Sequence, residues 1–228
     1  MKTYSVFEHL LEINQESASE LINIYHGLPG KSSSLIFPKL RGTQKLRVSE
    51  QELRFAMTSS MDRSPVHFLE YSVETPTENP YSFRGSIPRS GATDLTLYSG
   101  GKKLINIEFK AHNPSGDTFN KDIEKLLLEP YYGAWLHILE NINSATIKSI
   151  FNKLINAFNT INQLPKKPLY LSFLVLQKKI LISRKGKDDD LINFNPGKIL
   201  DLNYSEIKTF IDSKEVNKQI RDWHLNKY

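Results

Sequence analysis

An aspartate and a Glu-x-Lys triplet stand in two neighbouring segments that the sequence predicts to be β-strands. The first segment, Gly91–Tyr98, contains Asp94, and the second, Lys103–Ala111, contains Glu108 and Lys110. Side chains along a strand point alternately to the two faces of a sheet, so Glu108 and Lys110 share a face. Two carboxylates and an ammonium group on one surface can bind a divalent cation and activate a water molecule.

The apolar residues of the two segments restrict how they pair, because a slip of one residue would turn an apolar face outward. A three-residue connection over residues 100–102 supplies glycine where a tight hairpin needs positive φ. It predicts three cross-strand pairs, which are Ser99 with Lys103, Leu97 with Ile105, and Leu95 with Ile107. The same register places Asp94 directly opposite Glu108. Like charges in that position are destabilising, and a cation between them would remove the cost.

These residues resemble a known motif. The stretches Ala92–Leu95 and Ile107–Ala111 resemble the PD-(D/E)XK nuclease superfamily, which has the restriction-endonuclease-like fold. Its members carry an Asp on one core strand and Glu-x-Lys on the next, often with a Glu from the first core helix. Thr93 stands where the motif has its proline. The resemblance covers roughly Val48 to Leu139, less than half of the chain.

The resemblance implies a nuclease that hydrolyses phosphodiester bonds with Mg²⁺ or Mn²⁺. Asp94, Glu108 and the backbone carbonyl of Phe109 would bind the metal. Lys110 would assist the attacking water. The implied fold is a mixed central β-sheet flanked by helices, in the α/β class.

The resemblance also implies an acid from the helix that begins at Ser49, and two glutamates compete for this role. Glu52 fits a capping box with Ser49, because it follows three residues later. It also lies one turn before Ala56, on the side expected to face inward. Glu50 is the alternative. We expect Glu52 to be the catalytic acid and keep Glu50 as a candidate for contact with the substrate.

Three more residues near the motif are candidates for binding the substrate. Arg89 precedes the Asp94 strand and could grip a phosphate. His112 follows Lys110 at the mouth of the predicted site, and Lys125 lies on the helix after the hairpin. Each of them has an ordinary alternative, as a charged or polar residue on a solvated surface.

Charge favours an anionic partner. The net charge is +5 and the sequence pI is about 9.2, which suits nucleic acid first. Positive residues concentrate before and within the predicted acidic helix, as a phosphate-tracking arm or as a solvated loop: Lys39, Arg41, Lys45, Arg47 and Arg54. DNA is the expected substrate because it is the commonest one among similar nucleases.

Composition excludes several other classes of protein. The chain has no cysteine, so disulfides and thiolate metal sites are excluded. No apolar run approaches the length that spans a membrane, so no membrane partner is expected. The first residues lack the apolar stretch of a signal peptide, which predicts a cytoplasmic protein. A homodimer remains open.

The 228 residues are predicted to form a single nuclease-like domain. Residues 1–48 would be an N-terminal helix and loop, residues 49–140 the catalytic core, and residues 141–228 the helices and strands that complete the sheet. Besides the hairpin, the pattern predicts helices over Val6–Tyr25, from Ser49 past Met57, over Asp122–Asn141 with an interruption near Pro130, and over Ala145–Ile161 and Glu206–His224. It predicts further strands over Val66–Glu74, Leu169–Leu176, Lys179–Ser183 and Ile199–Leu202, with a loop over Thr75–Pro88.

Two other functions compete with the nuclease. One is a catalytically silent nucleic-acid-binding module with the same fold. The other is a protein-interaction module of a defence or mobile-element system, whose activity is supplied elsewhere. The first predicts that metal does not bind or that Asp94 and Glu108 diverge in space. The second predicts binding to a protein partner and no cleavage even with Mn²⁺.

Overall fold

A computed structural model describes residues 6–29, 34–63, 69–81, 89–161, 167–185 and 204–228. Its helices are α1 (Val6–His26), α2 (Glu50–Arg63), α3 (Gly116–Leu128), α4 (Ser144–Thr160) and α6 (Tyr204–Asp212). Its strands are β1 (Glu70–Tyr81), β2 (Arg89–Ser99), β3 (Lys102–Ala111), β4 (Tyr132–Leu139), β5 (Leu169–Val175), β6 (Ile180–Lys185), β7 (Lys218–Ile220) and β8 (Trp223–Lys227).

All eight strands belong to one mixed sheet in the order β1-β2-β3-β4-β5-β6-β8-β7. The first three strands form an antiparallel meander. Helix α3 then carries the chain back, so that β4 lies parallel to β3, and α4 does the same between β4 and β5. The remaining pairs are antiparallel. The predicted α/β class with a mixed central sheet flanked by helices is therefore confirmed.

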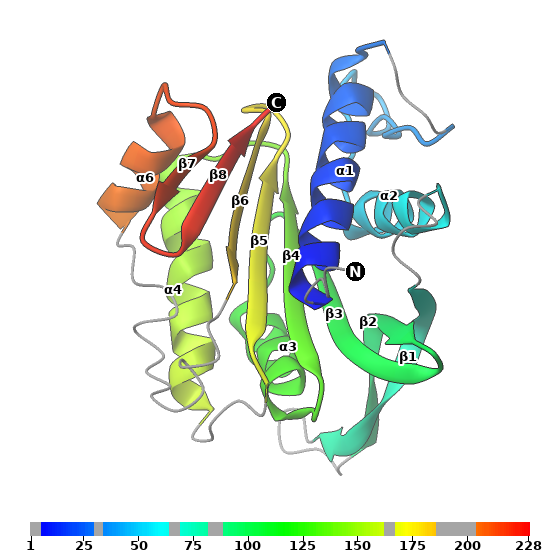
Figure 1. The fold of residues 1–228 in the computed structure, drawn as a ribbon. Coiled ribbons are helices and arrows are strands. Elements are labelled where there is room, and N and C mark those ends of the chain that lie inside the picture. The colour runs from blue at the N-terminus through cyan, green and yellow to red at the C-terminus, as the bar shows by residue number, and fades with distance from the viewer. Residues whose placement is uncertain (1–5, 30–33, 64–68, 82–88, 162–166, 186–203) are drawn as a thin grey trace.

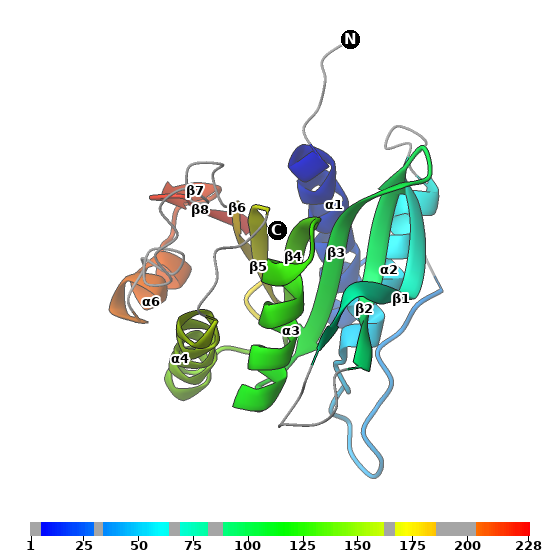
Figure 2. The same ribbon diagram turned by 90° about the horizontal axis from the view of Figure 1, so that it is seen from below.

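The sheet lies between two helical layers, as Figures 1 and 2 show. Helices α1 and α2 pack on one face, where Leu95, Ile107 and Phe109 are buried beneath them. Helices α3, α4 and α6 cover the other face, where their apolar residues surround Trp135 and Phe173. The alternation along β3 sends Asn106, Glu108 and Lys110 to the α3 side, and all three are buried. Among the described residues, no helix combines the length and the apolar character needed to cross a membrane.

The β2–β3 hairpin has the predicted apolar pairing but a different turn. Leu97 pairs with Ile105 and Leu95 with Ile107, as expected. Ser99 pairs with Lys102, so the predicted Ser99–Lys103 pair is wrong. Gly100 and Gly101 have φ of 54° and 73° and form a two-residue connection. Positive φ at both central residues matches the twist of the strands, and a register shift beyond Leu97 absorbs the extra residue.

Two expectations around the hairpin are wrong. Strand β1 runs on to Tyr81 through the predicted loop Thr75–Pro88, with an irregularity between Pro76 and Pro80 in its pairing with β2. A prolonged edge strand tolerates proline where no partner needs its N–H. The predicted helix over Asp122–Asn141 is the second error. Only its first part belongs to α3, and Tyr132–Leu139 is the strand β4.

The C-terminal region agrees only in part with the sequence. The predicted helix Ala145–Ile161 and the strands Leu169–Leu176 and Lys179–Ser183 correspond to α4, β5 and β6. The predicted helix Glu206–His224 is wrong in its second half, because α6 ends at Asp212 and β7 and β8 follow. The predicted strand Ile199–Leu202 lies outside the described residues.

Candidate functional site

Five charged side chains from three elements meet on the α3 side of the hairpin. We call them the charge cluster: Asp94 of β2, Glu108 and Lys110 of β3, and Asp122 and Lys125 of α3. The structure thus brings Asp94, Glu108 and Lys110 together, as the sequence predicted. Ionised groups are rarely buried unless they are paired, and all members of the cluster except the partly exposed Asp94 are buried and paired.

Lys110 lies among all three acids of the charge cluster. Its Nζ atom lies 2.9 Å from Asp122 Oδ2, 3.6 Å from Glu108 Oε2 and 3.8 Å from Asp94 Oδ2. The Lys110 Nζ atom also lies 5.8 Å from the ring centre of Trp135. The ammonium group is thus held most closely by Asp122 while it stays near both carboxylates of the hairpin.

Asp94 is the most exposed acid of the charge cluster. Its side chain is 25 % exposed, whereas that of Glu108 is 1 % exposed. The ladder of paired residues between the two strands ends at Leu95 and Ile107, so the predicted pair of Asp94 with Glu108 is not part of it. Instead of a backbone pair, Asp94 Oδ2 accepts a hydrogen bond of 2.7 Å from the backbone N–H of Phe109. Asp94 therefore marks the open side of an otherwise buried cluster.

Lys125 and Asp122 tie α3 to the hairpin. The Lys125 ammonium contacts Glu108 Oε1 and donates a hydrogen bond of 2.7 Å to the carbonyl of Ala92. It also lies 3.0 Å from Asp122 Oδ1, one helical turn earlier. The other oxygen of Asp122 holds Lys110, so this carboxylate bridges both lysines. Lys125 was predicted to contact the substrate, but in the structure its ammonium is occupied by the cluster itself.

Burial and neighbouring charges shift the pKa values of the charge cluster in opposite directions. Burial, reinforced by Asp122, raises the pKa of the Glu108 carboxyl despite its contact with Lys125. Burial also acts to raise the pKa of Asp122, but the two ammonium groups outweigh it and the pKa is lowered. The pKa values of Lys110 and Lys125 are raised, because nearby carboxylates outweigh the effect of burial. With three acids and two bases, the cluster favours one additional positive charge.

The structure favours Glu50 as the acid from α2 and so reverses the sequence-based preference for Glu52. Glu52 accepts hydrogen bonds from the backbone N–H of Ser49, at 2.8 Å, and from its hydroxyl, which is the capping box. Glu50 is half-buried, and its pKa is raised first by burial and then by Asp94, with Lys110 opposing. Of the two glutamates, Glu50 is therefore the one whose carboxylate interacts electrostatically with the charge cluster.

His112 has a positioning role in the structure. Its φ is 59°, and its Nε2 atom lies 2.6 Å from the carbonyl of Val48, just before α2. Because a carbonyl only accepts, this nitrogen carries the proton. The His112 carbonyl in turn accepts a hydrogen bond from His137 Nε2 at 2.7 Å. His112 thus fastens the start of α2, and with it Glu50, to the end of β3.

Two other groups of predicted substrate contacts have different outcomes. Arg89 begins β2, but its side chain lies outside the described part of the chain. Arg54 makes an ion pair of 3.0 Å with Glu74 of β1, so its charge is already partnered. The other positive residues of the predicted arm, which are Lys39, Arg41, Lys45 and Arg47, are exposed.

Oxygen donors for a metal are present, but they do not form a complete cage. Among the residues that the structure describes, no group of three or more His, Asp or Glu side chains is arranged to hold a metal ion. Mg²⁺ commonly binds through one or two carboxylates and completes its shell with water and substrate phosphate. Two carboxylates of the hairpin, Asp94 and Glu108, lie near the same Lys110 ammonium group and are the oxygen donors on the partly open side of the cluster. The excess negative charge of the cluster fits such a partial site as well.

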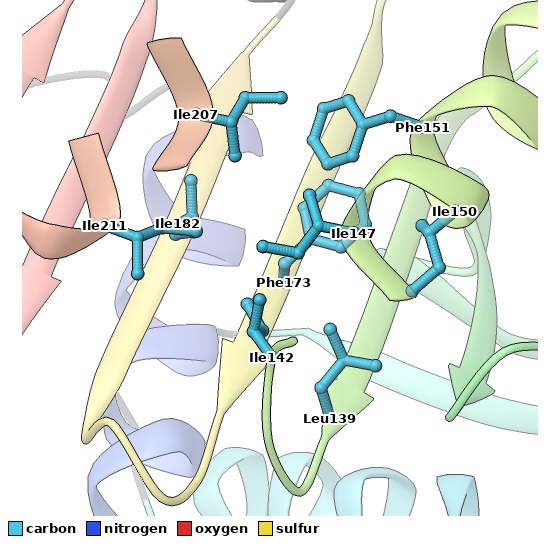
Figure 3. Close-up of a pocket in the computed structure, with 9 residues that line it drawn as sticks. All are labelled: Leu139, Ile142, Ile147, Ile150, Phe151, Phe173, Ile182, Ile207 and Ile211. Atoms are coloured by element: carbon cyan, nitrogen blue, oxygen red, sulfur yellow. The ribbon is translucent and has the colours of Figure 1, made fainter. Parts of the chain in front are cut away.

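A separate apolar pocket lies on the same side of the sheet, between α4, α6, β5 and β6 (Figure 3). Its walls include Ile147, Phe151, Phe173, Ile207 and Ile211. The pocket is lined entirely by hydrocarbon side chains and offers no group for acid–base, nucleophilic or metal chemistry. The chemically competent site is therefore the charge cluster.

Asp122 is the member of the charge cluster to which the sequence analysis gave no role, although it was placed at the start of the helix after the hairpin. Its signal was its spacing of three residues from Lys125, which places both on one side of a helix. Nothing in the sequence showed that this side would face the hairpin.

In comparisons with protein-family models, curated proteins and solved structures, the chain matches none of them.

Proposed function

We propose that this protein is a nuclease that hydrolyses phosphodiester bonds, with DNA as the preferred substrate and Mg²⁺ or Mn²⁺ as cofactor. The observation that carries the proposal is the convergence of Asp94, Glu108 and Lys110 on one partly open site. The order of elements supports it too. A helix, three antiparallel strands, a second helix and a parallel strand form the framework expected of a restriction-endonuclease-like core.

Each residue of the site has a distinct task in this proposal. Asp94, Glu108 and the Phe109 carbonyl would hold the metal, and Glu50 would act from α2 at its outer side. Lys110 would orient the attacking water and stabilise the negative charge that grows on the phosphate, because a prearranged ammonium needs no reorganisation. Asp122 would keep Lys110 in position. When bound, the metal lowers the pKa of its water and polarises the phosphate.

The direct test is cleavage of plasmid DNA, single-stranded DNA and RNA in Mg²⁺ or Mn²⁺. We expect Lys110→Ala to abolish cleavage while the thermal melt stays cooperative. The matched control is Lys102→Ala, which removes an exposed lysine at the other end of the same strand. Cleavage that persists in Lys110→Ala or in EDTA would reject the proposed mechanism.

A catalytically silent nucleic-acid-binding or protein-interaction module is the second candidate. The observation that favours it is the contact between Lys125 and Glu108, which already supplies the carboxylate with a positive partner. This candidate predicts that Mn²⁺ leaves the melting temperature unchanged and that no substrate is cut. Titration of Mn²⁺ into the wild-type protein and into Glu108→Gln separates the two candidates without requiring activity.

A further inference from the structure

The chain between α1 and α2 contains a short ordered hairpin, residues 38–47, which we call the basic hairpin. We propose that it binds the phosphate backbone of a nucleic acid beside the charge cluster. This inference rests on the proposed function for the class of partner, but not on catalysis. No acidic residue occurs between Glu20 and Glu50, and the basic hairpin carries four cations: Lys39, Arg41, Lys45 and Arg47.

The basic hairpin is a defined ribbon. The Leu40 N–H donates to the Lys45 carbonyl at 2.8 Å, and the Arg47 N–H donates to the Pro38 carbonyl at 2.6 Å. Gly42, with a φ of 74°, lies in its turn. The backbone that carries the four cations is therefore ordered, and Lys39 Nζ also donates to Gln44 Oε1 at 2.5 Å. An ordered backbone reduces the entropy lost on binding a ligand.

The pairing distributes the cations over both faces of the ribbon. Lys39 pairs with Leu46, so Lys45 and Arg47, which flank Leu46, lie on the face opposite to Lys39, while Arg41 lies in the turn. Residues two apart in a strand are separated by roughly 6.6 Å. All four side chains are exposed. A two-stranded ribbon of this kind has dimensions that the major groove of DNA admits.

The ribbon is anchored next to the charge cluster. Arg47 is followed by Val48, whose carbonyl accepts the 2.6 Å hydrogen bond from His112, two residues beyond Lys110. Figures 1 and 2 show the segment before α2 projecting from the body of the protein. A strand of phosphates that crosses the open side of the cluster thus has a second set of positive charges within reach.

Exposed apolar side chains near the basic hairpin distinguish a nucleic acid from a simple anion. Phe55, on the outer side of α2, is 56 % exposed, and Leu40 within the ribbon is 43 % exposed. Aromatic faces stack on bases, and cations beside them follow the backbone. An inorganic phosphate would use neither the stacking surface nor the spread of four charges.

The test is a binding measurement by fluorescence anisotropy in EDTA, with the Lys110→Ala variant so that no cleavage occurs. Labelled duplex DNA, single-stranded DNA and RNA are titrated from about 50 to 300 mM salt. Replacing Lys39, Arg41, Lys45 and Arg47 together by Gln should weaken binding at least about 30-fold at low salt. It should also flatten the log–log salt slope by about 2 to 4, since each lost duplex phosphate contact contributes about 0.9.

A matched control removes the same charge elsewhere. The control variant replaces four exposed lysines together by Gln, namely Lys148, Lys178, Lys208 and Lys214. It should change affinity less than about threefold and leave the salt slope unaltered. If the quadruple variant does not fold, the double variant with Lys39→Gln and Arg41→Gln tests two of the four cations. That double variant should give roughly half the change in salt slope, about 1 to 2.

Three results would overturn the inference. The first is an equal loss of nucleic-acid affinity in the quadruple basic-hairpin variant and the quadruple control variant. The second is unchanged affinity in both. The third is a larger loss of affinity for anionic lipid vesicles than for any nucleic acid. The proposed function fails separately. If the wild type never cleaves but the basic-hairpin variant loses binding, the hairpin stands and hydrolysis does not. If the wild type and the basic-hairpin variant cleave with the same KM, the proposed hydrolysis is retained and the proposed binding role of the basic hairpin is rejected.

Discussion

Two glutamates are almost completely buried beside α3, and the groups around them differ in kind. Glu129, just after the helix, accepts hydrogen bonds from the backbone N–H groups of Glu78 and Asn79, at 2.9 and 3.1 Å. It also accepts from the Asn79 side chain and from the Tyr81 hydroxyl, at 3.0 and 2.9 Å. These neutral donors belong to β1, so Glu129 clamps that edge strand to the helix.

Glu108 instead has two ammonium groups as its partners. Lys125 contacts one of its oxygens and Lys110 lies near the other. Both lysines also form ion pairs with Asp122. A carboxylate held by backbone donors cannot change partners without moving the fold. One held by lysine side chains can exchange a partner for another cation, because their stems are flexible. Equal burial is thus combined with fixed backbone partners at Glu129 and with exchangeable lysine partners at Glu108.

The largest expected difference between the two glutamates is in activity. Glu108→Gln should lower kcat/KM for cleavage at least about 100-fold, because it removes a carboxylate that would hold the metal in the proposed function. Glu129→Gln should change kcat/KM less than about fivefold below its melting temperature, since it lies outside the site. Steady-state cleavage of a labelled duplex in Mg²⁺ measures both. Similar losses in the two variants would erase the distinction.

Stability should show the opposite order. Glu129→Ala leaves two backbone N–H groups and the Tyr81 hydroxyl without their acceptor and should cost about 3 kcal/mol of unfolding free energy. Glu108→Gln should cost less than about 1 kcal/mol, because Asp122 still pairs with both lysines. Urea denaturation in EDTA gives both values. A larger cost at Glu108 would mean that its ion pairs hold the fold.

His137 extends the comparison to a buried base. Burial lowers its pKa to about 3, so the folded protein resists protonation there while the unfolded chain does not. Unfolding free energy should therefore be unaffected by this group above about pH 6.5 and fall by up to about 1.4 kcal/mol per pH unit below it. His137→Phe should flatten this decline in urea melts. The exposed His224→Gln should keep it, and an equal flattening there would assign the decline elsewhere.

The smallest expected effect is at Asp94. Asp94→Asn removes one negative charge from a cluster with three acids and two bases, and an amide oxygen can still accept from Phe109. We expect the protein without metal to gain about 0.5 kcal/mol of unfolding free energy. Thermal melts in EDTA measure it. A clear loss would mean that Lys110 depends on this carboxylate despite its closer contact with Asp122.

The sequence predicted the hairpin and the convergence of Asp94, Glu108 and Lys110 because that information is local. Alternation along β2 and β3 allowed only registers that match apolar faces, and the glycine pair marked the turn. The strand β4 was not predicted because Tyr132–Leu139 is buried on both faces. Its sequence therefore shows neither the two-residue alternation of a half-buried strand nor the 3.6-residue repeat of an amphipathic helix. Asp122 escaped because its partners lie on another element, and no spacing within α3 shows which way the helix turns.

The choice between Glu50 and Glu52 shows the same limit. Both positions lie in the first turn of α2, and helical periodicity alone does not tell which one is nearer to the charge cluster. The decision depends on the start of α2, which is set by the contact between His112 and Val48 across more than sixty residues. Long-range contacts of this kind leave no pattern in one sequence.

The short glycine turn between β2 and β3 has a consequence for how the molecule folds. A hairpin with such a tight connection closes over a small number of residues and forms in about 1–10 μs, long before distant segments meet. Asp94 and Glu108 are therefore brought face to face early, whereas Lys125 comes later with α3. We expect the folding rate to respond to ionic strength until that helix docks, because two like charges must first be held side by side.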